Sequence, residues 1–232
     1  MDKSIQLFIL PFSGGKAAQF DKLVANLDDR IDVIPIEYAG RGKRIKEPFF
    51  KNYNSFIDDV RDCIERQRVK SIPFAILGYS IGGIFTYDLI AKERLSEYPS
   101  QIFIGACENS RDQGEKLSSL PENEFWDKII AFGGVDQKLI KNKKFLKLFS
   151  KTMRADFYIG EQYIYSETDA KITCPVTIMY CEEDTPLSNI KKWRDASNNI
   201  VEFHEFYGGH FFILDHHDRV AELVNKKLID DY

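Results

Sequence analysis

The sequence predicts an α/β fold in which helices flank a mostly parallel β-sheet. Short apolar runs, most of them rich in β-branched residues, alternate along the chain with segments of helical length, and a succession of strand, helix and strand builds parallel sheets. The chain has 232 residues, of which 44% are hydrophobic and 29% charged, as is typical of a globular protein with a sizeable core. The alternation therefore defines the fold class, and the composition agrees with it.

The strands are predicted from six apolar runs, each close to a glycine, a proline or a charged residue. These runs are residues 5–10, 31–36, 74–77, 102–107, 176–181 and 201–206. Residues 20–27, 56–69 and 84–95 are predicted to form helices between them. In the second of these segments, Phe56, Val60 and Ile64 recur at helical spacing, which indicates one buried face.

Residues 108–170 interrupt the alternation and carry helical rather than strand-like patterns. Pro121 is placed to begin a helix, and Gly133-Gly134 are placed to end it. The chain contains no internal repeat, low-complexity tract or linker. We therefore expect residues 1–232 to form a single domain with a helical lid inserted at about residues 108–170.

Charge and cysteine content exclude several classes of function. With 32 basic and 36 acidic residues the formal charge is −4, which does not attract nucleic acid. The apolar run 5–12 is too short to span a bilayer, and Asp2 cancels Lys3 where a signal peptide would be basic, so we expect no membrane association. The four cysteines lack a C-x-x-C pair, which indicates reduced thiols in the cytoplasm and no zinc site.

No nucleotide or metal cofactor is expected. Gly14-Gly15-Lys16 lacks both the earlier glycine and the following serine or threonine of a phosphate-binding loop. The dinucleotide pattern G-x-G-x-x-G does not occur in the chain. These absences leave side-chain chemistry to carry any reaction.

The sharpest motif is Gly78-Tyr79-Ser80-Ile81-Gly82-Gly83, which follows a predicted strand and precedes a predicted helix. A serine on a tight strand-to-helix turn holds its hydroxyl above the sheet, and the flanking glycines avoid a clash there. Without that context, glycine and serine would indicate only an ordinary turn. The context favours Ser80 as a nucleophile.

A nucleophilic serine needs a histidine base and a carboxylate that orients it. His204 lies in a predicted strand, and His216 and His217 lie at the start of the last helix, so His210 remains as the base. On folds that carry a nucleophilic serine on such a strand-to-helix turn, the acid precedes the histidine in the chain. Residues 176–181 end in Glu182, Glu183 and Asp184; we choose Asp184, with Glu183 as the alternative.

Acyl chemistry also needs donors for the tetrahedral oxyanion. The N–H group after the nucleophile, that of Ile81, is the first candidate. The second comes from the loop after an early strand, and there we choose the Ser13 N–H, with the neighbouring Phe12 as the other option.

Taken together, these motifs resemble the type II thioesterases of nonribosomal peptide and polyketide synthesis, which are discrete α/β-hydrolases. The similarity runs in family order from about Ile5 to the last helix, and the early Phe-Ser-Gly-Gly and the run from Arg154 to Phe157 are its most specific parts. The matching stretches are Leu10-Pro11-Phe12-Ser13-Gly14-Gly15, Gly78-Tyr79-Ser80-Ile81-Gly82-Gly83, Leu120-Pro121 with Phe125 and Gly133-Gly134, Arg154-Ala155-Asp156-Phe157 with Glu161, and Gly208-Gly209-His210-Phe211.

The resemblance implies a triad of Ser80, Asp184 and His210, and it favours Asp184 over Glu183. It also implies hydrolysis of acyl groups from the phosphopantetheine arm of carrier-protein domains. We expect the enzyme to be a monomer. Two positions depart from the family pattern. Ala39 stands where proline is usual, and Cys181 stands where a glycine usually precedes the acid by three residues.

Two other classes of function compete with this interpretation. A small-molecule carboxylesterase or acyltransferase would share the fold but not the matching residues of the insert. A degenerate hydrolase that only binds ligands would not need an intact Ser80 and His210. Both are less consistent with the sequence than a carrier-protein thioesterase.

Aromatic and basic residues of the insert have two interpretations each. We favour a packing core over an acyl channel for the aromatic side chains, and a carrier contact competes with a solvated helix face for the lysines. The aromatic residues are Phe125, Trp126, Phe132, Phe145, Phe149, Phe157 and Tyr158, and the lysines are Lys138, Lys141, Lys143, Lys144, Lys147 and Lys151. A second basic cluster, with the same two interpretations, consists of Arg41, Lys43, Arg44 and Lys46.

Overall fold

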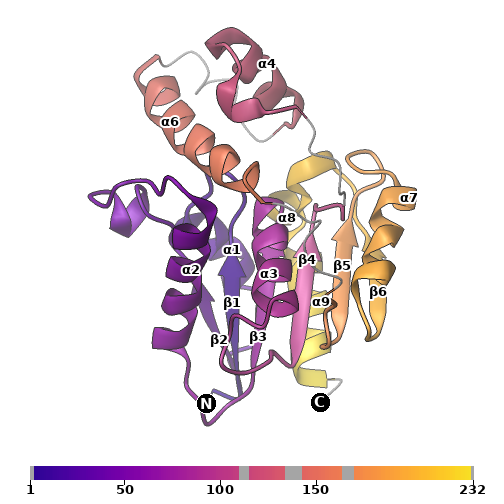
Figure 1. Cartoon of the computed structure of the whole chain (residues 1–232). Helices are drawn as coiled ribbons and strands as arrows, with labels where there is room; N and C mark the ends of the chain where they lie inside the picture. Colours follow the sequence, from indigo (N-terminus) through magenta and orange to yellow (C-terminus); the bar gives the residue numbers. More distant parts are fainter. Residues whose placement is uncertain (1–2, 110–114, 134–142, 164–169, 231–232) are drawn as a thin grey trace.

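A six-stranded sheet forms the centre of the computed structural model, which describes residues 3–109, 115–133, 143–163 and 170–230 (Figure 1). The strand order is β2-β1-β3-β4-β5-β6, and each neighbouring pair is parallel. The strands are β1 (Ile5–Leu10), β2 (Ile31–Pro35), β3 (Phe74–Tyr79), β4 (Gln101–Gly105), β5 (Val176–Tyr180) and β6 (Val201–Glu205). The predicted parallel sheet is confirmed, and strand starts and ends lie within two residues of the predicted ones.

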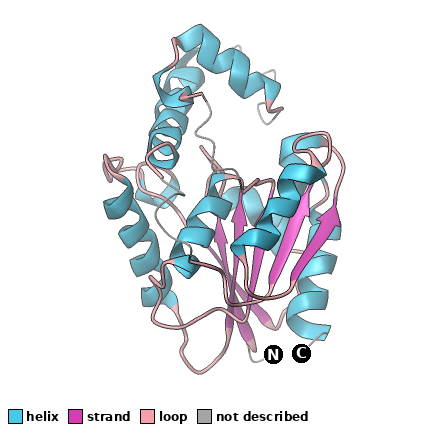
Figure 2. Ribbon diagram, turned by 45° about the vertical axis from the view of Figure 1, so that its right-hand side comes forward, coloured by secondary structure: helices cyan, strands magenta, loops and turns pink. Residues whose placement is uncertain are grey.

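Helices cover both faces of the sheet (Figure 2). One face packs against α2 (Tyr53–Gln67), α3 (Ile81–Ala91) and α7 (Leu187–Ile190), and its largest fully buried side chain is Trp193. The other packs against α1 (Asp21–Val24), α8 (Phe212–Asp215) and α9 (His217–Asn225). Each central strand is buried on both sides, which is why its sequence is a continuous apolar run rather than an alternating one.

All three predicted helices differ from the observed ones in their bounds. Helix α2 begins three residues before the predicted start and ends two residues before the predicted end. The segment 20–27 forms a 3₁₀ turn at Ala17–Phe20 followed by the single α-turn of α1. Helix α3 begins three residues before the predicted start, directly after Ser80. A helix that is buried on nearly every side has no polar face, so its sequence lacks the periodic signal that marks where a helix begins.

Helices α4 (Glu122–Ala131) and α6 (Lys143–Gly160) are inserted between β4 and β5 and stand over the carboxyl ends of the strands (Figure 1). Pro121 directly precedes α4, and Gly133 follows it with a positive φ of 87°, as predicted; Gly134 lies outside the described residues. Phe125, Trp126, Ile129 and Met153 form a small buried cluster of their own between the two helices. The favoured interpretation of Phe125 and Trp126 as packing residues is therefore confirmed.

The register of the strands brings the loops that follow β1, β3 and β4 to one edge of the sheet. Leu10 pairs with Gly78, and Tyr79 pairs with Gly105, so β1, β3 and β4 end side by side. The segments that follow these strands begin at Pro11, Ser80 and Ala106. Ligand sites of open parallel sheets lie at this carboxyl edge.

Candidate active site

Ser80 occupies a strained turn between β3 and α3. Its φ of 55° and ψ of −122° are unusual for a residue with a side chain. The turn is held by the Ser80 N–H, which donates to the Gly105 carbonyl at 2.7 Å, and by the Ser80 carbonyl, which accepts from the Gly83 N–H at 2.8 Å. A Cβ at Gly82 would lie 2.1 Å from the Leu10 carbonyl oxygen, so the close approach of helix and strand requires glycine.

His210 reaches Ser80 from the loop after β6. The two residues before it, Gly208 and Gly209, have φ of 97° and 76°, which turn the chain sharply at the sheet edge. The Nε2 atom of His210 lies 2.9 Å from the Ser80 Oγ. The imidazole is mostly buried, with 15% of its side chain exposed.

Asp184 contacts the other side of the same ring. Its Oδ2 and Oδ1 atoms lie 2.9 and 3.1 Å from Nδ1 of His210. The loop curls because the N–H groups of Asp184 and Thr185 both donate to the Cys181 carbonyl, at 3.1 and 2.9 Å. Glu183 is exposed, and its carboxylate lies 3.7 Å from the Cys181 thiol instead. The structure thus brings Ser80, His210 and Asp184 together and leaves Glu183 outside.

Two further side chains, neither of them predicted from the sequence, hold the histidine loop. The buried Tyr79 hydroxyl donates to the His210 carbonyl at 2.7 Å and accepts from the Ile213 N–H at 3.3 Å. Burial holds the pKa of Tyr79 well above its usual value, which keeps this donor protonated. The Cys181 sulfur accepts from the Gly209 N–H at 3.3 Å. The only sequence signal for Cys181 was its departure from the family pattern.

The two predicted oxyanion donors lie on the turns that flank this cluster. Ile81 is the first residue of α3, where an N–H has no partner within the helix. Ser13 lies in a buried turn that the Gly15 N–H closes by donating to the Phe12 carbonyl at 2.8 Å. Within the part of the chain that the structure describes, neither N–H donates to a protein acceptor. The two groups therefore remain the candidate oxyanion donors.

Phe132, at the end of α4, is an aromatic residue of the insert that contacts this cluster. Its ring centroid lies 5.4 Å from that of His210, and 41% of the residue is exposed. The packing interpretation thus does not extend to this position. Phe145 has a side chain outside the described residues.

The structure changes the interpretation of the second basic cluster. Arg41 is buried and paired with Asp156, so it does not belong to a surface cluster. Arg44 is paired with Glu47 and Asp59.

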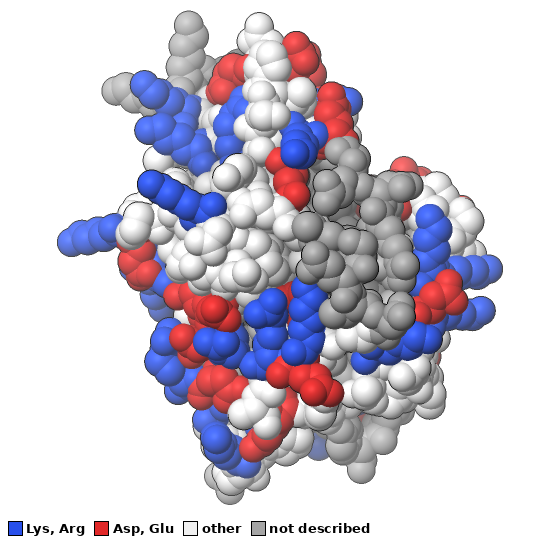
Figure 3. All heavy atoms as spheres, viewed as in Figure 1, with Lys and Arg blue, Asp and Glu red and all other residues white. Residues whose placement is uncertain are grey.

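Of the insert lysines, Lys147 and Lys151 are exposed on α6, whereas Lys138 and Lys141 and the side chains of Lys143 and Lys144 lie outside the described residues. Figure 3 shows basic side chains gathered in the upper left of the view, where Figure 1 places α6.

Neither a metal cluster nor a membrane span is found in the described part of the chain. Its His, Cys, Asp and Glu residues form no group of three or more that could hold a metal ion. None of its helices is both long and apolar enough to cross a membrane.

Comparisons with known proteins agree on one family. Residues 5–228 match the family model of the thioesterase domain. The chain is 26% identical over 220 residues to the medium-chain S-acyl fatty acid synthase thioesterase of Rattus norvegicus, covering 92% of this chain and 83% of that protein. It is 24% identical over 230 residues to the gramicidin S biosynthesis protein GrsT of Aneurinibacillus migulanus, covering 97% and 89%. The solved structure of ClbQ, from the colibactin NRPS/PKS pathway, superposes with a TM-score of 0.89 at 26% identity and covers 98% of both chains.

Proposed function

The chain belongs to the thioesterase family, has the α/β-hydrolase fold and is a thioester hydrolase, and from this premise we propose that it removes acyl or aminoacyl groups from the phosphopantetheine arm of carrier-protein domains. The proposed role of the enzyme is editing, in which hydrolysis of a wrong or stalled acyl group regenerates the nonribosomal peptide or polyketide synthase that carries it. The observation that carries the chemistry is the contact of His210 with both Ser80 and Asp184.

The proposed reaction begins with proton transfer from the Ser80 hydroxyl to Nε2 of His210. Asp184 accepts the Nδ1–H of the ring and so fixes the tautomer that leaves Nε2 free as a base. The Ser80 oxygen attacks the acyl carbon, and the N–H groups of Ile81 and Ser13 stabilise the oxyanion.

Collapse of the tetrahedral intermediate breaks the carbon–sulfur bond, and the leaving sulfur takes the proton from Nε2 of His210 and departs as a thiol. Because the pKa of an ordinary thiol is about 8.5, a thiol leaves more readily than an alcohol and needs less help from a general acid. His210 then activates a water molecule, which attacks the acyl-serine, and the carboxylic acid is released. No cofactor enters either half of the reaction.

The substrate class is supported by the names of the relatives. The rat protein is named as a thioesterase of fatty acid synthase, GrsT as a protein of gramicidin S biosynthesis, and ClbQ as part of an NRPS/PKS pathway. Each name thus connects its protein with a synthase or with a biosynthetic pathway. A carrier-bound thioester is therefore the substrate that this family membership favours.

The proposal includes the domain organisation and the setting of the enzyme. We take residues 1–232 as one domain, with about 108–170 as a lid, because α4 and α6 stand over the sheet edge that carries Ser80 (Figure 1). Four free thiols support a cytoplasmic setting. We expect a monomer, which light scattering after size-exclusion chromatography measures directly.

The nucleophile is tested by Ser80→Ala. Because the triad acts as a unit, we expect hydrolysis to fall by about 10⁵ to 10⁶ with the fold retained. Ser188→Ala, an exposed serine of α7, is the matched control and should retain full activity. Unchanged turnover in Ser80→Ala, measured as thiol release, would exclude this mechanism.

The substrate class is tested with three sets of acyl donors. Acetyl-, butyryl- and aminoacyl-loaded carrier domains are compared with the matching coenzyme A thioesters and with p-nitrophenyl esters. We expect the highest kcat/KM for carrier domains. A clear preference for the oxygen esters would favour the alternative of a small-molecule carboxylesterase.

A further inference from the structure

A buried ion pair joins α6 to the loops below it, and the reaction as proposed makes no use of it. Arg41 follows β2, and Asp156 lies on α6; only 2% and 5% of their side chains are exposed. The guanidinium binds the carboxylate through both terminal nitrogens, with Nη1 2.6 Å from Oδ2. The Asp156 carboxylate raises the pKa of Arg41 above its usual value, although burial alone would lower it.

The same carboxylate also holds the turn that carries the proposed second oxyanion donor. The Gly14 N–H donates to Oδ2 of Asp156 at 2.7 Å. Arg41 Nη1 donates in addition to the Gly15 carbonyl at 3.3 Å. Gly14 directly follows Ser13, so the peptide group next to the proposed donor is anchored to α6.

The face of α6 that carries Asp156 also contacts both oxyanion turns by packing. A Cβ built on Gly14 would lie 2.8 Å from Cγ of Met153 and 2.9 Å from Cε2 of Phe149, so α6 lies directly against this turn. A Cβ on Gly160 would lie 2.5 Å from Cδ1 of Ile81. One helix thus touches Ile81 and Gly14, the residue next to Ser13.

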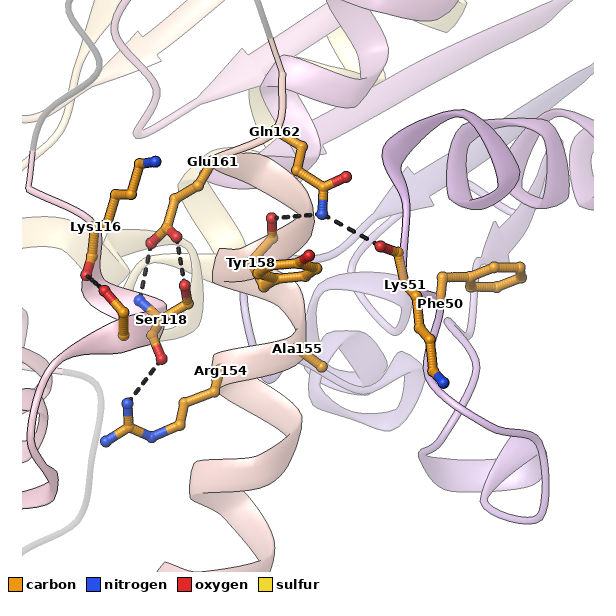
Figure 4. A pocket seen from close by; sticks show the side chains of 10 residues that line it. Phe50, Lys51, Lys116, Ser118, Arg154, Ala155, Tyr158, Glu161 and Gln162 are labelled. Atoms are coloured by element: carbon orange, nitrogen blue, oxygen red, sulfur yellow. Dashed lines mark hydrogen bonds between the residues drawn. The ribbon is translucent and has the colours of Figure 1, made fainter.

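The opposite face of α6 is fixed to other parts of the chain (Figure 4). Glu161 accepts the N–H and the hydroxyl of Ser118, and Arg154 donates to the Ser118 carbonyl at 2.9 Å. Gln162 donates to the Lys51 carbonyl at 3.5 Å. These contacts border an open groove of about 480 Å³ that contains none of Ser80, Asp184 and His210. They hold α6 in place, so that Asp156 is a fixed anchor.

We propose that Asp156 is a positioning residue for oxyanion stabilisation: its carboxylate holds the Gly14 N–H and thereby sets the direction of the Ser13 N–H, while Arg41 neutralises the buried charge. This inference rests on the serine mechanism proposed above. Loss of one oxyanion donor costs about 10² to 10³ in rate. A donor that stays but is displaced costs less, so we expect a loss of about 10- to 100-fold in kcat.

The test must separate this role from the stability that the ion pair contributes. Removing one partner of a buried pair leaves an uncompensated charge and destabilises the fold, whereas neutral replacement of both is often tolerated. We therefore compare two double variants that share Arg41→Met. Asp156→Asn keeps a carbonyl oxygen that can accept from the Gly14 N–H, and Asp156→Leu does not.

Hydrolysis of a p-nitrophenyl ester is measured per active site, with sites counted by the endpoint of fluorophosphonate labelling. The asparagine variant should retain most of the kcat, and the leucine variant should lose about 10- to 100-fold relative to it, with KM and the midpoint of the pH profile unchanged. The affinity for a trifluoromethyl ketone, which forms a tetrahedral adduct, should fall in parallel. Arg41→Met with Asp156→Met provides a second non-accepting variant if leucine does not pack.

Equal kcat per titrated site in the accepting and non-accepting variants would overturn the proposal and leave the ion pair a structural role. The ester assay makes the result independent of the natural acyl carrier. A failure of the serine mechanism would be detected separately, because Ser80→Ala would then hydrolyse the same ester as fast as the parent.

Discussion

Replacement of Asp184 by asparagine tests whether this carboxylate, rather than a neighbouring one in the same acidic loop, orients His210. In the structure both carboxylate oxygens lie within 3.1 Å of Nδ1 of His210, and no other acidic side chain contacts this ring in the described part of the chain. Asparagine has the same shape, but its amide can present an N–H to Nδ1 and so favour the wrong tautomer. The Nε2 atom then carries the proton and cannot act as a base.

The expected loss of kcat in Asp184→Asn is large, and it should be smaller than the loss in Ser80→Ala. In the Ser-His-Asp triad of a serine protease, this change lowers kcat by about 10⁴. At about 1.4 kcal/mol for each factor of ten, this is about 5 kcal/mol of transition-state stabilisation. Removal of Ser80 should cost about 10⁵ to 10⁶, so the Asp184→Asn enzyme should retain about 10- to 100-fold more activity than Ser80→Ala.

Initial rates of thiol release from an acyl thioester measure both variants at saturating substrate. Glu183→Gln is the matched control, because Glu183 belongs to the same loop but is exposed and does not touch the ring. It should change kcat by less than about twofold, in keeping with the small effects of surface substitutions. If Glu183→Gln were the more damaging change, Glu183 would be the acid and the observed arrangement of the loop would not be the active one.

Three further outcomes follow from the contacts described. Tyr79→Phe removes the donor to the histidine carbonyl and leaves a buried N–H unsatisfied, so stability should fall by about 2 to 3 kcal/mol and Tm by about 5 to 10 °C; an unchanged thermal transition would contradict this. Iodoacetamide at pH 8 should label the partly exposed Cys63 before Cys107, because burial raises the pKa of Cys107 to about 12, and mass spectrometry of the native protein checks the order. If exposed lysines of α6 steer an acidic carrier, Lys147→Gln with Lys151→Gln should lower kcat/KM for carrier substrates at low salt and leave a p-nitrophenyl ester unaffected; equal kinetics on both would assign these lysines to solvation alone.

The sheet could be predicted from the sequence because parallel strands that are buried on both faces consist of continuous apolar runs. Each such run became a strand, and the turn residues beside it marked its end. Helix boundaries were harder to predict. Gly82 and Gly83 are poor helix formers, yet they lie in the first turn of α3, since only glycine permits the contact of Gly82 with the Leu10 carbonyl. Tertiary packing outweighed local propensity there.

The three central residues of the site could be predicted from the sequence for a related reason. Ser80 stands in a motif, and His210 and Asp184 follow predicted strands whose carboxyl ends must share one edge. The contacts of the supporting residues could not be predicted from the sequence. Arg41 and Asp156 lie 115 positions apart and belong to no common motif, and a lone arginine in a run of basic residues indicates an exposed cluster far more often than a buried pair.

The burial of Arg41 also changes how the insert relates to the reaction. A helical insert over a sheet edge is most simply understood as a cover that selects the acyl group. Here, however, α6 contacts the Gly14 turn through Asp156 and Met153 and contacts Ile81 through Gly160. A buried charge pair is retained only with precise partners, because each ion loses its hydration. The insert is therefore part of the scaffold that shapes the site. Helix α6 cannot move away from the sheet without also releasing the Gly14 turn, which carries the proposed donor.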